Sequence, residues 1–358
     1  MQKTVVTISG IRPDFIRMSQ VFKKLDKYFN HILIHSGQHY DQLLSGVFFD
    51  ELDIRKPDYF LSTGKSSSTH YEQLSYLSTE IFNLFKRENI NPDLIIFLGD
   101  SNTVTVSVPL KKEGYKICHI EGGMRSYDKR MLEEINRTVC DHCSEIIFVY
   151  HEDYKKQLEL ENIRKNVYVV GNTITEVCLE FKPTEPKENK MILLDIHRPE
   201  NFKYKERMKN IIKYANLCHK KYGIPVYMLK FFGTCKRIEE YELELGDIIL
   251  TDLLSFKNYL KTIYHCRFII SDSGTGQEEP ALFQTPVIVP RDYTERPQSI
   301  KADCSFMLNV NQCDEKHWNE SFEWLNREHQ FEIDWLGDGK TADHIVNILQ
   351  KEYFPCSN

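Results

Sequence analysis

The feature that most constrains the fold of this chain is a series of short, continuous apolar runs separated by helical stretches. Apolar runs without polar alternation are typical of strands buried on both faces, as in parallel sheets covered by helices. In the first half the predicted strands are Thr4–Ile8, Ile32–His35, Leu94–Leu98, Lys116–Ile120, Ile146–Tyr150 and Val167–Val170. In the second half they are Met191–Leu194, Pro225–Leu229, Ile248–Leu250, Phe268–Ile270 and Pro286–Val289. The sequence therefore predicts an α/β protein built on parallel sheets.

The chain is long enough for two domains, because it has 358 residues and domains typically hold about 100–200. The last strand of the first half runs into Gly171-Asn172, and a polar stretch with two prolines follows at Lys182–Lys190. We predict an N-terminal domain of residues 1–172 and a C-terminal domain of residues 173–340. A helical pattern at Ala342–Tyr353 predicts that residues 341–358 pack back on the first domain.

Charge and hydropathy exclude several classes of protein. The 46 basic and 52 acidic residues give a net charge of −6 without a basic block, which argues against nucleic-acid binding. No apolar run approaches the roughly 20 residues that span a bilayer. Met1-Gln2-Lys3 leads straight into the first predicted strand and does not resemble a signal peptide. We expect a cytoplasmic protein that binds neither nucleic acid nor membrane.

Motifs for metals and common cofactors are missing or incomplete. Among ten cysteines, Cys140 and Cys143 have the spacing of half a zinc site, but no second Cys-x-x-Cys completes it. The sequence has no P-loop, no full Gly-x-Gly-x-x-Gly and no His-Glu-x-x-His. We therefore predict no metal and no cofactor.

Charged residues follow several predicted strands directly. Arg12, Asp100 and Glu121 each stand just past a strand end, and ligands of parallel sheets bind beyond the carboxyl ends of the strands. Ser9–Pro13 forms a strand-to-helix turn that suits a phosphate, although an ordinary turn with exposed arginines would look the same. The acids Asp100, Glu121 and Glu133 form a candidate acid–base cluster.

A second anion-binding loop is predicted at Asp272–Glu279, where a strand, a Gly/Ser/Thr loop and a helix start follow one another. Glu278 and Glu279 would repel a phosphate but suit the hydroxyls of a ribose. Alternatively, the two acids only complement the helix dipole.

Taken together, these segments resemble the UDP-N-acetylglucosamine 2-epimerase family, in the same order and spacing across nearly the whole chain. The matching segments are Gly10–Met18, Gly37–Asp41, Gly99–Ser101, Glu121–Arg125, Leu132–Arg137, Gly171–Thr173, His197–Asn201, Asp272–Glu279 and Thr294–Pro297. The resemblance implies two Rossmann-like domains in a GT-B-like fold, with the active site in the inter-domain cleft and UDP on the C-terminal domain. It also implies a homodimer that needs neither metal nor nicotinamide. The implied reaction eliminates UDP and adds it back to a glycal intermediate.

The resemblance also assigns residues. The catalytic positions fall on Asp100, Glu121, Glu133 and His197. The substrate or UDP contacts fall on Arg12, Arg17, Arg125, Arg198, Glu200, Asn201, Tyr259, Ser273, Gly274, Glu278, Glu279 and Arg296. Tyr259 is expected to stack on uracil, Ser273 to contact a phosphate and Glu279 the ribose. Gln38, His39 and Gln42 match a regulatory second UDP-sugar site found in some relatives.

Departures from the family pattern leave alternatives open. Gly122 replaces an alanine, Leu132 a proline, and Lys230–Cys235 a His-Pro motif of the nucleotide pocket. The segments Asn30–His39, Phe48–Leu52 and Lys56–Tyr59 look closer to branches that act on modified sugars, such as UDP-N-acetyl-L-rhamnosamine, other 6-deoxy-L-hexosamines or UDP-2,3-diacetamido uronic acids. The other readings are a hydrolysing epimerase that releases free sugar and UDP, a GT-B glycosyltransferase, and a UDP-sugar sensor.

Overall fold

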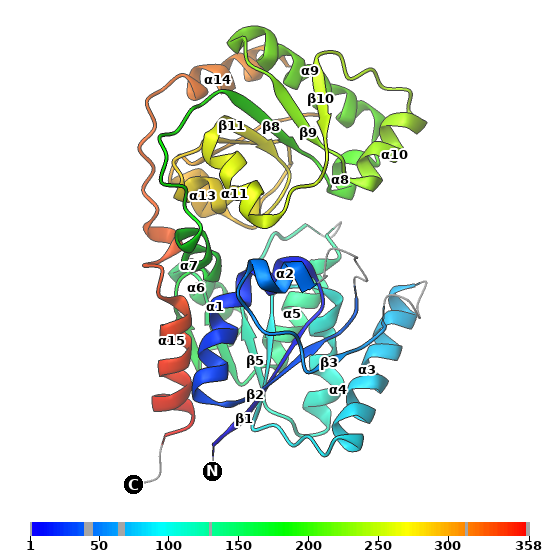
Figure 1. Cartoon of the computed structure of the whole chain (residues 1–358), viewed down its shortest axis with the longest axis vertical. Coiled ribbons are helices and arrows are strands. Elements are labelled where there is room, and N and C mark those ends of the chain that lie inside the picture. Colours follow the sequence, from blue (N-terminus) through cyan, green and yellow to red (C-terminus); the bar gives the residue numbers. More distant parts are fainter. Residues whose placement is uncertain (1, 39–45, 64–68, 129–130, 312–313, 356–358) are drawn as a thin grey trace. The chain divides into compact units, whose positions relative to one another are not determined.

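A computed structural model of the chain describes residues 2–38, 46–63, 69–128, 131–311 and 314–355. The chain forms two compact units, of which unit 1 comprises Met1–Val177 with Trp335–Asn358 and unit 2 comprises Cys178–Asp334. Each unit contains one parallel β-sheet with helices around it (Figure 1). Among the described residues, none of the helices combines the length and the apolar character that crossing a bilayer requires.

The sheet of unit 1 has seven parallel strands in the order β3-β2-β1-β4-β5-β6-β7. The strands are β1 (Thr4–Ser9), β2 (Asn30–His35), β3 (Tyr59–Phe60), β4 (Leu94–Leu98), β5 (Ile117–Ile120), β6 (Ile146–Val149) and β7 (Val167–Val169). Every residue of β4, β5 and β6 is buried, as expected for strands covered on both faces. The predicted parallel sheet of the first half is confirmed.

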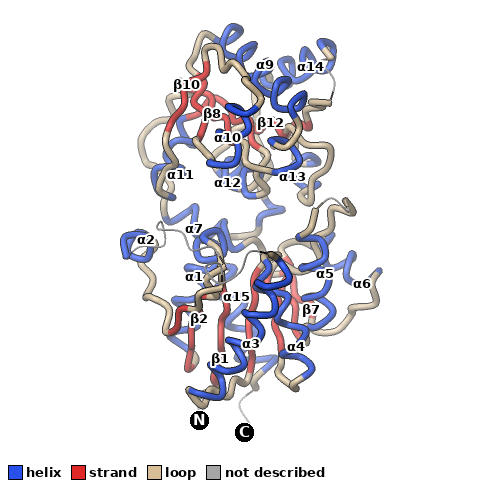
Figure 2. The backbone as a smooth tube through the Cα atoms, turned by 90° about the vertical axis from the view of Figure 1, so that its right-hand side faces the viewer, coloured by secondary structure: helices blue, strands red, loops and turns tan. Residues whose placement is uncertain are grey.

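Helices cover both faces of this sheet, as Figure 2 shows. They are α1 (Arg12–Tyr28), α2 (Gly46–Glu51), α3 (His70–Arg87), α4 (Ser107–Lys112), α5 (Glu133–Cys143), α6 (Glu152–Leu160), α7 (Thr173–Glu180) and α15 (Thr341–Ile348). Pro13 and Asp14 occupy the first turn of α1, where a proline loses no hydrogen bond and a carboxylate suits the helix dipole. The C-terminal α15 packs against α1, and Lys24 Nζ donates to Asp343 Oδ1 at 2.6 Å (Figure 1).

The sheet of unit 2 has six parallel strands in the order β10-β9-β8-β11-β12-β13. The strands are β8 (Met191–Asp195), β9 (Val226–Leu229), β10 (Ile248–Thr251), β11 (Cys266–Ser271), β12 (Val287–Val289) and β13 (Ser305–Met307). The helices are α8 (Pro199–Phe202), α9 (Lys205–Tyr222), α10 (Phe232–Glu240), α11 (Phe256–His265), α12 (Glu279–Leu282), α13 (Pro297–Lys301) and α14 (Glu315–Leu325). The second predicted parallel sheet is confirmed as well.

Both sheets change direction at an equivalent point. In unit 1 the chain adds β2 and β3 on one side of β1 and then crosses to β4 on the other side; in unit 2, β8 has the same relation to β9 and β11. Ligands of such sheets bind outside the carboxyl ends of the strands at this reversal point. The search for a site therefore starts at the ends of β1 and β4 and at the ends of β8 and β11.

Candidate active site

Charged residues from neighbouring strands meet at the carboxyl edge of the sheet of unit 1. Arg12 follows β1, Asp100 follows β4 and Glu121 follows β5, and β4 pairs with both β1 and β5. The predicted placement of these three residues along one sheet edge is therefore confirmed.

Glu121 is held in a buried ion pair. Its Oε2 lies 3.1 Å from Nη2 of Arg17 and accepts a hydrogen bond from the Tyr150 hydroxyl at 3.2 Å. Arg17 is 5% exposed and Glu121 is 6% exposed, and the guanidinium lies over the Tyr150 ring at 5.3 Å. Glu121 also has a left-handed backbone with φ of 72°, a conformation that costs roughly 1–3 kcal/mol and is typical of functional sites.

Asp100 and the start of α5 form the second part of this cluster. The carboxylate of Asp100 pairs with Arg137, and Asn136 Nδ2 donates to the Asp100 carbonyl at 2.9 Å. Glu134 accepts hydrogen bonds from the backbone N–H and hydroxyl of Ser126 at 3.1 and 2.8 Å. Glu133 is the half-buried first residue of α5, and its catalytic role stays a prediction.

Asp14 is a buried acid that the motifs did not single out. Burial and the nearby charges of Asp100 and Glu121 raise the pKa of Asp14 well above its usual value, although the Gly10 N–H and Arg17 oppose this. A Cβ atom on Gly99 would lie 3.9 Å from both Asp14 Oδ1 and Glu121 Oε2, so these carboxyl groups flank the same glycine. The one sequence signal was an acid directly after Arg12-Pro13 in a strand-to-helix turn.

A buried network holds the loop that carries Glu121. Asp141 lies 2.7 Å from Nδ1 of His119 and 2.8 Å from Nη2 of Arg125, and it accepts the Gly123 N–H at 3.1 Å. Burial would raise the pKa of Asp141, but the charge and hydrogen bond of His119 and the charge of Arg125 hold it below the usual value. Arg125 also donates to both carboxylate oxygens of Glu161 at 2.9 and 2.7 Å. These contacts assign Arg125 to loop support, and its predicted contact with substrate stays a prediction.

Asp272 organises the equivalent edge of unit 2, at the end of β11. It accepts hydrogen bonds from the backbone N–H groups of His197 and Arg198 at 3.0 and 3.1 Å, and from Asn201 Nδ2 at 3.0 Å. Asn201 also donates to the Pro290 carbonyl and accepts from Arg207, both at 3.0 Å. Asn201 therefore braces the loop, and a contact with substrate stays a prediction.

His197 lies at the centre of this edge. Its Nδ1 is 3.0 Å from Oδ1 of Asp195, and its side chain keeps 30% exposure. Burial would lower the pKa of His197, but the charge and hydrogen bond of Asp195 and the charge of Asp272 raise it above its usual value. Asp195 was not among the predicted site residues.

The predicted aromatic contact lies close to the same aspartate. The Tyr259 hydroxyl is 3.5 Å from Oδ2 of Asp195. Burial and the charges of Asp195 and Glu279 raise the pKa of Tyr259 well above its usual value. Asp195 thus contacts both His197 and Tyr259, and Glu279 lies within electrostatic range of Tyr259.

The Gly/Ser loop of unit 2 is packed tightly against Arg296. A Cβ on Gly274 would lie 2.6 Å from Nη1 of Arg296, so a larger residue would have to displace this guanidinium. Arg296 Nε donates to Glu278 Oε1 at 2.7 Å, and Nη1 donates to Glu295 Oε1 at 2.6 Å. Glu278 is fully buried in this pair, which favours Glu279 over Glu278 as the acid for a ribose.

Three further predicted residues have internal partners. The Ser273 hydroxyl lies 3.1 Å from that of Thr275. Glu200 accepts from the Tyr293 hydroxyl at 3.0 Å. Gln38 Oε1 accepts the N–H and hydroxyl of Thr103, both at 3.1 Å. The other two residues of the predicted regulatory site, His39 and Gln42, lie outside the described residues.

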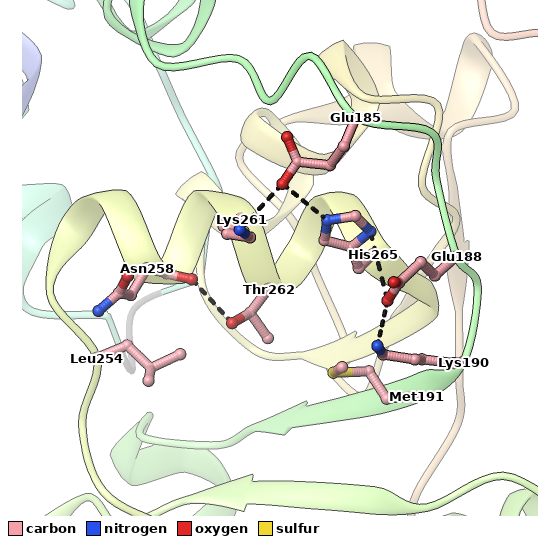
Figure 3. A pocket seen from close by; sticks show the side chains of 9 residues that line it. All are labelled: Glu185, Glu188, Lys190, Met191, Leu254, Asn258, Lys261, Thr262 and His265. Atoms are coloured by element: carbon pink, nitrogen blue, oxygen red, sulfur yellow. Dashed lines mark hydrogen bonds and ion pairs between the residues drawn. The ribbon is translucent and has the colours of Figure 1, made fainter.

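A separate cavity of about 470 Å³ lies on unit 2, where His265 of α11 stands between Glu185 and Glu188 (Figure 3). Lys261 Nζ lies 3.0 Å from Glu185 Oε1, so ion pairs tie the incoming chain segment to α11. None of the predicted site residues lines this cavity. Within the described ranges, no three His, Cys, Asp or Glu side chains gather as metal ligands would.

Comparisons with known proteins bear on these clusters. Residues 23–350 match the family model described as UDP-N-acetylglucosamine 2-epimerase. The UDP-N-acetylglucosamine 2-epimerase of Methanocaldococcus jannaschii is 32% identical over 96% of this chain and 97% of its own length. Its crystal structure with UDP-GlcNAc and UDP has a TM-score of 0.87, at 30% identity and coverage of 97% and 99% of the two chains.

One further relative and one further solved structure differ in what they share with the chain. A UDP-2,3-diacetamido-2,3-dideoxy-D-glucuronate 2-epimerase of Pseudomonas aeruginosa is 30% identical over 97% of this chain and 99% of its own length. UGT2 of Phytolacca americana, solved with UDP-2-fluoro-glucose and pterostilbene, has a TM-score of 0.53 at 11% identity, over 96% and 92% of the two chains. This second likeness shows the GT-B-like fold alone.

Proposed function

The chain belongs to the UDP-N-acetylglucosamine 2-epimerase family, a family of isomerases, and on that basis we propose that it inverts carbon 2 of a UDP-2-acetamido sugar. The observation that carries the proposal is the acid cluster of unit 1. Asp100 and Glu121 follow the adjacent strands β4 and β5, each beside a buried arginine, Arg137 and Arg17.

The reaction needs an acid and a base near carbon 2 of the sugar, whose hydrogen is hard to remove as a proton. The hydrogen on carbon 2 is not acidic, so UDP must begin to leave carbon 1 with the bonding electron pair before that hydrogen departs as a proton. This elimination gives a glycal, and UDP then adds back to carbon 1 while a proton reaches carbon 2 from the other face. We draw the acid and base for the two faces from Asp100, Glu121 and Glu133, because positioned carboxyl groups can perform both roles.

Unit 2 suits the nucleotide. Tyr259 offers an aromatic ring for a base, Glu279 a carboxylate for ribose hydroxyls, and the loop at Ser273 a turn for a phosphate. We expect Tyr259→Ala to weaken UDP binding by about 1–3 kcal/mol, the usual contribution of base stacking, and Glu279→Ala to weaken it as well. Isothermal titration with UDP measures both, and unchanged affinity in both variants would place the nucleotide elsewhere.

The sugar itself admits two candidates. Plain UDP-N-acetylglucosamine is the substrate in the name of the Methanocaldococcus relative, and a diacetamido uronate is that of the Pseudomonas relative. Identities of 32% and 30% do not separate them. The Arg12-Pro13 start supports the non-hydrolysing branch over one that releases free sugar. The homodimer and the cytoplasmic location stay predictions that sedimentation and cell fractionation would test.

Product analysis tests the function directly. Purified protein is incubated with each UDP-2-acetamido sugar in EDTA, without NAD and without an acceptor. We expect a mixture of two UDP-sugars that differ at carbon 2. Free sugar plus UDP would indicate the hydrolysing branch, and turnover that requires an acceptor would indicate a glycosyltransferase. Activity that is lost in EDTA and restored by a divalent ion would contradict the metal-free reaction.

A further inference from the structure

The pairing of Asp195 with His197 goes beyond the motif that singled out His197. Asp195 is the last residue of β8, and its side chain is 5% exposed. One carboxylate oxygen lies 3.0 Å from Nδ1 of His197. The other accepts the Ser271 hydroxyl at 3.3 Å and lies 3.5 Å from the Tyr259 hydroxyl. The carboxylate is therefore fixed from β11 and α11 as well as from its own strand.

The imidazole of His197 is fixed on other sides too. Its backbone N–H donates to Asp272 Oδ1 at 3.0 Å, and the same oxygen lies 3.6 Å from Nδ1. The ring packs against Phe231 with centroids 4.8 Å apart and planes at 41°. Phe231 belongs to the segment Lys230–Cys235, which departs from the family's His-Pro motif.

The charges around the ring favour its cationic form. Asp195 and Asp272 both lie within 4 Å of Nδ1, Arg198 opposes them, and the net effect raises the pKa of His197. Nδ1 faces the carboxylates, so Nε2 is the nitrogen on the opposite side of the ring. Among the described residues no hydrogen bond to Nε2 occurs, and the side chain keeps 30% exposure.

We propose that Asp195 is a positioning residue that holds His197 as an imidazolium whose Nε2–H donates to an anionic oxygen of the diphosphate, while Phe231 fixes the plane of the ring. The proposal rests on the proposed function for the identity of the anion. A charge-assisted N–H bond to a leaving oxyanion strengthens as negative charge develops there. A carboxylate behind a catalytic imidazole holds its tautomer and orientation and stabilises the imidazolium.

The variant that tests this is Asp195→Asn, which keeps the shape of the side chain and removes its charge. We expect kcat to fall by up to about 10⁴-fold, the loss known for an Asp→Asn change behind a catalytic histidine. Activity of the wild type should persist until the pH rises through the raised pKa of His197, and in Asp195→Asn the loss should begin at lower pH. If Asp195 only packs the end of the strand, the variant should be less stable or have a higher KM. The pH at which its activity falls should then match that of the wild type.

Two comparisons isolate the effect. Glu240→Gln makes the same change of charge in a surface ion pair with Arg237 on α10 and should leave kcat and its pH profile unchanged. In a His197→Ala background, Asp195→Asn should have little further effect on kcat, because a positioning residue acts through its partner.

NMR titration of the His197 imidazole requires no turnover and therefore separates this proposal from the proposed function. We expect the wild-type ring to titrate above about 6.5, the usual histidine pKa, and the Asp195→Asn ring to titrate lower. A wild-type ring that titrates at or below 6.5 would overturn the proposal even if the variant failed to fold. So would an unchanged titration in a folded variant. If His197 titrates as expected in both proteins but the wild type has no epimerase activity, the proposed function is rejected. The pairing of Asp195 with His197 would still hold.

Discussion

Two buried acids at the edge of the unit 1 sheet experience opposite surroundings. Glu121 is paired with Arg17 at 3.1 Å, which favours the carboxylate. The pKa of Asp14 is raised well above its usual value, because burial and the charges of Asp100 and Glu121 disfavour a further anion. The two carboxyl groups thus differ in their surroundings although they flank the same glycine, Gly99.

The raised pKa of Asp14 predicts a pH effect on stability. An unfolded aspartate loses its proton near pH 4, whereas folded Asp14 keeps it to a higher pH. Between these two values the folded state binds the extra proton, so its contribution to stability is lost as the pH rises. In Asp14→Asn this loss is absent, so the free energy of unfolding of the variant relative to the wild type should increase with pH above about 4. Denaturant titrations across a pH series measure it, and a constant difference would contradict it.

Asp100→Asn and Glu121→Gln test the catalytic acids. We expect kcat to fall about 10²–10⁴-fold with substrate binding largely kept, because each change removes an acid–base group. Asp93→Asn serves as the matched control, since Asp93 lies at the opposite end of β4 and pairs with Lys3 at 2.8 Å. A rise in KM with kcat spared would reduce Asp100 and Glu121 to binding groups.

Position after a strand singled out Asp100 and Glu121 in the sequence, whereas His197 was assigned by the resemblance to the family. Asp195 and Phe231 were not predictable as partners of His197, because Phe231 comes from another strand end and the sequence does not show which way the Asp195 side chain turns at the end of β8. The contacts of Arg125 and Asn201 within the protein were not predictable for a similar reason. Their partners, Glu161 and Arg207, lie outside the motifs that match the family.

Among the elements, the strands were the easiest to predict and the short edges the hardest. The interior strands are continuous apolar runs, and each appears within a residue or two of its predicted ends. The edge strands β3 and β13 were missed, whereas the edge strands β7 and β10 were predicted, because Tyr59–Phe60 and Ser305–Met307 are too short and, in β13, too interrupted by serine to stand out as apolar runs. Neither edge contributes to the candidate site.

The loop after β5 explains one departure from the family pattern. A Cβ on Gly122 would lie 2.2 Å from Cγ2 of Ile147 and 2.7 Å from Oδ1 of Asp141. Gly122→Ala, which restores the family residue, should therefore destabilise this chain by about 1–3 kcal/mol through overpacking.

Ile147→Ala provides the matching test, because it removes the nearest clashing atom. Alone it should destabilise the buried β6, yet the double variant should lose less stability than the sum of the two single variants. Thermal unfolding of the four proteins measures this coupling. Strict additivity would mean that the loop after β5 relaxes around the new methyl group.

At the scale of the whole molecule, the two units repeat one strand order and place their polar clusters at equivalent sheet edges. Unit 1 carries the candidate acids and unit 2 carries the residues suited to a nucleotide. The epimerase proposal requires both, because the sugar needs an acid and a base and UDP needs a binding site. The repeated apolar runs made both sheets predictable. The substituents of the sugar were not, because they depend on side chains that no strand pattern marks.

Turnover in D₂O, followed by NMR, tests the central claim most directly. If the chain eliminates UDP and adds it back to a glycal, the returning proton comes from solvent, so the epimerised product should carry deuterium at carbon 2. A slow variant such as Asp100→Asn should also release some UDP and glycal. An epimerised product that carries no solvent deuterium at carbon 2 would contradict the account.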